Sequence, residues 1–144
     1  MGMYTELNYN TELKQSTPTD VIVLLEYMVG ERDNFIGLLP DNPLFEDTGR
    51  WPFMLRCDSY YFDADTHSTL RFDEISMSYY LCIQTNLKNY SAEIENFIDW
   101  IAPYIEQHDG AYLGFYRYEE SDWPILIHAP ATLTSTYSLG EQDG

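Results

Sequence analysis

The sequence predicts an α+β domain: an antiparallel sheet of about five to six strands with two helices packed on one face. Three observations support this class. Residues 75–87 alternate apolar and polar side chains, as a strand does. Residues 91–105 repeat apolar side chains at helical spacing. The two helical segments lie too far apart for a parallel βαβ run, so an antiparallel sheet, in a ferredoxin-like order with additions, fits the order of elements.

Residues 3–13 form the first predicted strand, because apolar or hydroxyl-bearing side chains alternate with polar ones along it. The next element is a helix with Thr17 as its cap, Pro18 at its first position and Gly30 at its end. The stripe of this helix that we expect to be buried comprises Val21, Leu24, Leu25 and Met28.

Residues 31–52 combine turn signals with apolar side chains, which predicts a loop packed across the domain rather than a solvated linker. Residues 53–62 are predicted to form a second strand and residues 63–68 a turn. Residues 69–72 continue as a strand that pairs with the segment after it. The apolar side chains of the loop are Phe35, Ile36, Leu38, Leu39, Leu44, Phe45 and Trp51.

The predicted central strand covers residues 75–87. Its far face is mixed rather than charged, which is typical of a strand inside a sheet. The residues expected on its buried face are Ile75, Met77, Tyr79, Leu81, Ile83 and Leu87.

The second predicted helix follows directly. Ser91 would cap it, and Glu93 and Glu95 would lie near the positive end of its dipole. Pro103 is expected to kink the helix and Gly110 to end it. Its apolar stripe consists of Ile94, Phe97, Ile98, Ile101 and Ile105.

Two further strands are predicted, at residues 111–119 and 125–129. We expect a single domain over residues 1–136 and a flexible C-terminal tail over residues 137–144. The face of the sheet away from the helices is expected to be aromatic and acidic.

The composition limits the classes of function. The 24 acidic residues outnumber seven basic ones, giving a formal charge of −17, which disfavours direct binding of nucleic acid or of an anionic membrane. The apolar fraction of 44% indicates a packed core. No apolar run could span a bilayer and no signal-peptide pattern is present, so we expect a cytoplasmic protein in which Cys57 and Cys82 are free thiols, with a disulfide as the alternative.

Metal and catalytic patterns are weak. Acidic and polar residues from Asp63 to Glu74 fall on ligand positions of a twelve-residue calcium loop, but Ser68 replaces the glycine that this loop requires and Arg71 occupies a ligand position. A solvated hairpin turn is favoured, and we expect no cofactor or metal. The histidines, which would support an enzyme only within a pocket that also holds a carboxylate, are His67, His108 and His128.

The acidic and aromatic residues are the strongest functional signal. Carboxylates at these spacings can imitate the charge of a phosphate backbone and attract a basic protein partner. The alternative is that the charge serves solubility alone. The candidate partner-binding residues are Asp58, Asp63, Asp65, Asp73, Glu74, Glu93, Glu95, Asp99, Glu106, Tyr60 and Tyr80.

Two runs, LRCDSYYF at residues 55–62 and LKNYSAEIENFIDWIAPYI at residues 87–105, resemble a family of small uncharacterised proteins of bacteria and phages. The resemblance covers roughly residues 4–127 and implies no catalytic or binding residue. In size and acidity the chain also resembles anti-CRISPR and anti-restriction inhibitors. The leading hypothesis is therefore a non-enzymatic inhibitor of a basic, nucleic-acid-binding bacterial defence protein. An immunity-type protein that neutralises a basic toxin and a small enzyme are the alternatives, and the oligomeric state, including a homodimer, stays open.

Overall fold

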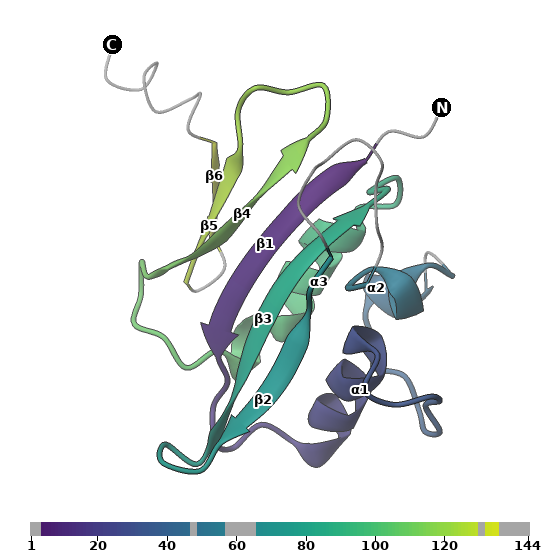
Figure 1. Cartoon of the computed structure of the whole chain (residues 1–144), viewed down its shortest axis with the longest axis vertical. Helices are drawn as coiled ribbons and strands as arrows, with labels where there is room; N and C mark the ends of the chain where they lie inside the picture. Colours follow the sequence, from purple (N-terminus) through teal and green to yellow (C-terminus); the bar gives the residue numbers. More distant parts are fainter. Residues whose placement is uncertain (1–3, 47–48, 57–65, 130–131, 136–144) are drawn as a thin grey trace.

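The computed structural model describes residues 4–46, 49–56, 66–129 and 132–135. Its centre is a six-stranded antiparallel sheet in the order β2-β3-β1-β4-β5-β6 (Figure 1). The predicted α+β class with an antiparallel sheet is thereby confirmed. The strands are β1 (Thr5–Glu12), β2 (Thr69–Asp73), β3 (Ser78–Leu87), β4 (Tyr112–Tyr118), β5 (Ile125–His128) and β6 (Thr132–Ser135).

The helices give the sheet its connectivity. Helix α1 (Thr19–Val29) lies between β1 and β2 in the chain, and α3 (Glu93–Ile101) lies between β3 and β4. With the strand order β2-β3-β1-β4, this is the split βαβ arrangement of ferredoxin-like folds. Strands β5 and β6 extend the sheet beyond β4. The shorter elements are α2 (Pro43–Glu46), the 3₁₀ turn η1 (Trp51–Phe53) and the 3₁₀ turn η2 (Ala102–Tyr104).

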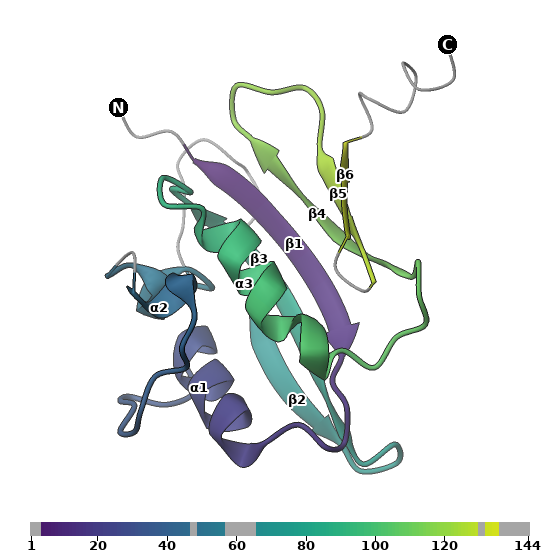
Figure 2. The same cartoon turned by 180° about the vertical axis from the view of Figure 1, so that it is seen from behind.

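The core joins one face of the sheet to buried residues of both α1 and α3, and α3 crosses the face of β1 and β3 (Figure 2). The predicted stripe of the second helix is buried, although its last member, Ile105, lies beyond α3. The ring of Phe97 packs edge-on against Tyr9 of β1, with 6.0 Å between centroids. The predicted stripe of α1 is also buried, and Gly30 ends that helix in the left-handed conformation. Period-two burial along β1 confirms the first strand.

The predicted N-terminal caps of the two helices are wrong. Helix α1 begins after Pro18, and the Thr17 hydroxyl donates to the Lys14 carbonyl instead of capping the helix. Ala92, in the left-handed conformation, precedes α3, and the side chain of Asn89 accepts the Ile94 N–H at 2.8 Å. Asn89 thus satisfies a helix-end donor that Ser91 was expected to satisfy.

Other boundaries also differ from the prediction. Helix α3 passes into η2 at Pro103, as the proline predicts, but Gly110 lies in a later turn. In the expected loop, Phe35 packs against the core and Leu44, Phe45 and Trp51 are buried, whereas Ile36, Leu38 and Leu39 are exposed, so the packed-loop prediction fails for residues 36–39. Residues 53–56 continue η1 and a turn rather than forming a strand, and residues 57–62 lie outside the described residues. Strand β6 was not predicted, and the tail 137–144 lies outside the described residues.

The open face of the sheet is not the acidic surface that was expected. Its centre combines neutral polar side chains with the aromatic ring of Phe115. Asn8 lies between Gln84 and Phe115, and Asn10 pairs with Cys82, on the side away from Leu7 and Tyr9. Amides and a thiol there carry no charge. The open face therefore offers no carboxylate array to a basic partner at its centre.

Candidate functional site

The structure separates the predicted acidic residues. Asp73 and Glu74 lie at the turn between β2 and β3, and Glu106 reaches the same end of the molecule because its N–H donates to the Glu12 carbonyl at 2.8 Å. Glu93 and Glu95 lie in the first turn of α3, beside the other end of β3. Asp99 is exposed on α3 and Tyr80 is exposed on the open face of the sheet. The predicted residues that lie outside the described ones are Asp58, Tyr60, Asp63 and Asp65.

The turn between β2 and β3, residues 73–78, is here called the hairpin tip. The Asp73 carboxylate accepts the Ser76 N–H at 3.1 Å and the Ser76 hydroxyl at 2.8 Å. These hydrogen bonds, the hydroxyl bond first, lower the pKa of Asp73. The Met77 N–H donates to the Asp73 carbonyl, and Met77 has a left-handed φ of 59°. The chain thus reverses without glycine, at the cost of backbone strain at Met77.

Side chains from β1 and the segment after it fix the hairpin tip to the rest of the fold. The Ser78 hydroxyl donates to the Glu12 carboxylate at 2.6 Å, and the Ser76 and Ser78 hydroxyls lie 2.9 Å apart. The Gln15 amide donates to the Ser76 carbonyl at 2.7 Å. A turn held by this many hydrogen bonds is preorganised, although it projects from the sheet (Figure 1).

The hairpin tip exposes apolar side chains, which corrects the predicted buried face of the central strand. Ile75 is 94% exposed and Met77 57% exposed, and the neighbouring Phe72 is also exposed, its ring packed on Tyr79. The alternating pattern continues to Ile75 in sequence, but strand pairing stops at Asp73 and Ser78 because Asp73 captures the next backbone donors. The structure therefore presents apolar residues among carboxylates.

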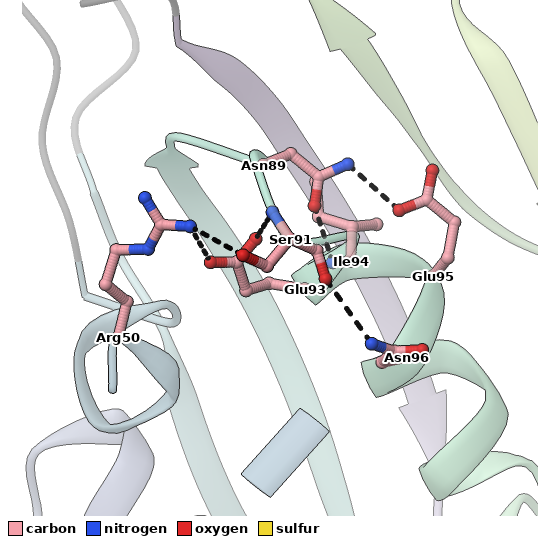
Figure 3. A network of polar contacts seen from close by, with 7 residues as sticks. All are labelled: Arg50, Asn89, Ser91, Glu93, Ile94, Glu95 and Asn96. Carbon is pink, nitrogen blue, oxygen red and sulfur yellow. Dashed lines mark hydrogen bonds and ion pairs between the residues drawn. The ribbon is translucent and has the colours of Figure 1, made fainter. Parts of the chain in front are cut away.

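Glu93 is a second correction, because it cannot contribute to a partner-binding surface: its side chain is 0% exposed. Figure 3 shows its partners. The Arg50 guanidinium lies 2.6 Å from one Glu93 oxygen, and the Ser91 N–H donates to the other at 2.9 Å. A carboxylate removed from water needs such a counter-charge. We call Glu93, Arg50 and Ser91 together the Glu93 cluster.

Glu95 is also engaged within the protein. It accepts hydrogen bonds from the Asn89 amide and from the Tyr116 hydroxyl, each at 2.9 Å. Burial, and then the adjacent Glu95 carboxylate, raises the pKa of Tyr116. Of the predicted partner-binding carboxylates in the described residues, Asp73, Glu74 and Glu106 are gathered at one end, with Asp99 exposed on α3.

The histidine and metal alternatives gain no support. His67 and His108 are exposed, and His128 lies against the ring of Tyr112. Residues 69–73 form a strand paired with β3, which is incompatible with one continuous calcium loop. No cluster of three His, Cys, Asp or Glu residues in the described part of the chain could hold a metal ion.

Glu12 and Gln15, which anchor the hairpin tip, were not predicted from the sequence. The spacing Asp73-x-x-Ser76 is a signal for a side-chain-stabilised turn and could have located the tip. Among the described residues, no helix has the length and apolarity to cross a membrane. Comparison of the chain with protein-family models, curated proteins and solved structures finds no match.

Proposed function

We propose that this protein is a non-enzymatic inhibitor that binds a basic, nucleic-acid-binding protein through the hairpin tip. The observation that carries the proposal is the outward presentation of Ile75 and Met77 on a backbone fixed by Asp73, Ser78 and Gln15. Exposed apolar side chains on a rigid, strained turn bury their surface only when a partner covers them.

Preorganisation gives this tip an advantage as a binding element. A loop that is already ordered loses little conformational entropy on association, so more of the interaction free energy appears as affinity. Binding energy in protein interfaces concentrates in a few well-buried side chains surrounded by polar ones. Ile75 and Met77 have the position of such a centre, and Asp73, Glu74 and Glu12 have the position of the rim.

The negative charge of the chain indicates a partner with a basic surface. A chain with a formal charge of −17 is attracted over long range to a cationic surface, and the carboxylates around the tip would meet arginine and lysine there. Proteins that hold nucleic acid in a groove, such as CRISPR effectors, line it with basic side chains. The inhibitor would occupy this groove and exclude the nucleic acid, with Ile75 in an apolar socket within it.

The test is a binding assay against a panel of purified CRISPR effectors and restriction nucleases, repeated from low to high salt. We expect at least one complex that weakens steeply as salt rises and that competes with the nucleic acid. Replacement Ile75→Asp should weaken it about tenfold or more. The matched control is Ile36→Asp, since Ile36 is 90% exposed but lies outside the tip.

Three outcomes would count against the proposal. These are the absence of any complex across the panel, affinity that does not change with salt, and equal losses of affinity for the Ile75 and Ile36 replacements.

A further inference from the structure

A hollow of about 260 Å³ is lined by Leu87 and Lys88, at the end of β3 opposite to the hairpin tip. Met54 and Leu87, both buried, form its apolar floor, and Phe53 from η1 lies at its exposed side. Tyr4 contributes a further aromatic ring. Because most of the lining is apolar, a ligand with an apolar body would release ordered water and bury its surface there.

Two of the seven basic residues of the chain, Arg50 and Lys88, line the same hollow. The Lys88 ammonium lies 5.4 Å from the centre of the Tyr4 ring, and the Arg50 guanidinium lies at the same distance from the Tyr90 ring. Within the described residues Lys88 has no acidic side chain in ion-pair range. The cation is therefore available to a negatively charged group on a ligand.

The buried Glu93 carboxylate fixes the position of the second cation. It holds Arg50 at 2.6 Å, while the Arg50 side chain stays 42% exposed (Figure 3). A second contact, from the guanidinium to the Ser91 hydroxyl at 3.3 Å, sets its orientation. Glu93 is thus a positioning residue, which orders the guanidinium at the edge of the hollow before any ligand binds.

The charges select the class of ligand. Lys88 supplies one positive charge beside the hollow that no acidic side chain of the described residues pairs with, in a chain that is otherwise strongly negative. Charges beyond a Debye length of about 8 Å are screened, so this local site can attract one negative charge but not a polyanion.

We propose that this hollow binds a small organic monocarboxylate, with the apolar body against Met54 and Leu87 and the carboxylate between Lys88 and Arg50. The site is separate from the hairpin tip, so it stands or fails independently of the proposed inhibitor function.

The test uses octanoate as the probe and octanol as the neutral compound of equal chain length. Titration of the ¹⁵N-labelled protein, followed by amide chemical shifts, should show octanoate shifting the amides of Leu87, Lys88 and Phe53 with saturation. Octanol should bind at least fivefold more weakly. The variant Lys88→Met, which keeps the apolar stem, should lose at least fivefold in octanoate affinity.

Arg71→Met is the matched control, because Arg71 is an exposed cation on β2 that does not line the hollow. Its octanoate affinity should equal that of the unchanged protein. The proposal is overturned if octanoate gives no saturable shifts, if octanol binds as tightly, or if Arg71→Met weakens binding as much as Lys88→Met.

Discussion

The two ends of β3 each combine a carboxylate with a residue in the left-handed conformation, but they differ in which side chains are buried. Each end carries a non-glycine residue in the left-handed conformation, Met77 before the strand and Ala92 after it, and the described residues contain no other. At the hairpin tip the carboxylate of Asp73 lies at the surface and apolar side chains point outward. At the Glu93 cluster the carboxylate is buried and a cation lies above it.

This difference shows that the neighbours of a carboxylate decide its role. Asp73 accepts hydrogen bonds from the amides and hydroxyl of its own turn, so it shapes a projecting loop. Glu93 is paired with Arg50, from a distant part of the chain, so it joins η1 to α3. The first arrangement suits contact with a large partner and the second suits the wall of a small hollow.

The largest expected effect comes from removing Arg50, the cation paired with the buried Glu93 carboxylate. We expect Arg50→Ala to lower the free energy of unfolding by about 2–3 kcal/mol, because it leaves a buried carboxylate without its counter-charge. Breaking a fully buried pair costs about 3–5 kcal/mol, and the partial exposure of Arg50 reduces this. Urea denaturation measures the change. Arg71→Ala is the control, and a loss for Arg50→Ala no greater than that of the control would contradict the buried ion pair.

Glycine replacements at Met77 and Ala92 are expected to have a smaller effect, and they compare the backbone strain at the two ends of β3. Met77→Gly and Ala92→Gly should each change the free energy of unfolding by no more than about 1 kcal/mol, and in the stabilising direction. Glycine relieves the left-handed strain, but its larger unfolded-state entropy offsets part of the gain. Thermal unfolding of both variants checks this. A clear destabilisation of either would mean that its side chain contributes contacts that outweigh the strain.

The smallest expected effect concerns acid. Hydrogen bonds lower the folded-state pKa of Asp73. The ionised carboxylate therefore stabilises the tip at pH values above the unfolded-state pKa of aspartate, which is about 3.9. This stabilisation is lost as the pH falls through the lower folded-state pKa. The amide shifts of Ser76 and Met77, followed from pH 7 to pH 2, should therefore change with a midpoint below that of an ordinary aspartate.

The matched variant for this titration is Asp73→Asn, which keeps a hydrogen-bond acceptor but cannot ionise in this range. Its Ser76 and Met77 shifts should lose the transition. A transition that persists in Asp73→Asn would assign the pH dependence to another group.

Local patterns were sufficient to predict much of the fold. Alternation along β1 and the three- and four-residue spacing along α3 reflect which side of each element meets the core, so both were predicted with their buried faces. Strand β6 has little apolar alternation, and it forms because pairing with β5 satisfies its backbone. The exposure of Ile75 could not be read from alternation, because Asp73 ends the pairing through side-chain bonds.

The candidate sites were less predictable than the elements. Asp73 and Glu74 were identified as surface carboxylates, but Glu93, from the same composition argument, is buried. Its partner Arg50 lies in a segment that was expected to be only a loop. The hollow beside it is lined by residues from three distant segments of the chain, so no spacing of residues along the sequence could predict it.

The sequence by itself determines the strong negative charge, the periods of β1 and α3 and the stop at Gly30, since these depend on composition and on neighbours within a few residues. The tertiary structure alone decides which carboxylates face the solvent and which are buried. The free energy of burying a charge depends on counter-charges and hydrogen-bond donors that folding brings from distant positions, as it brings Arg50 to Glu93.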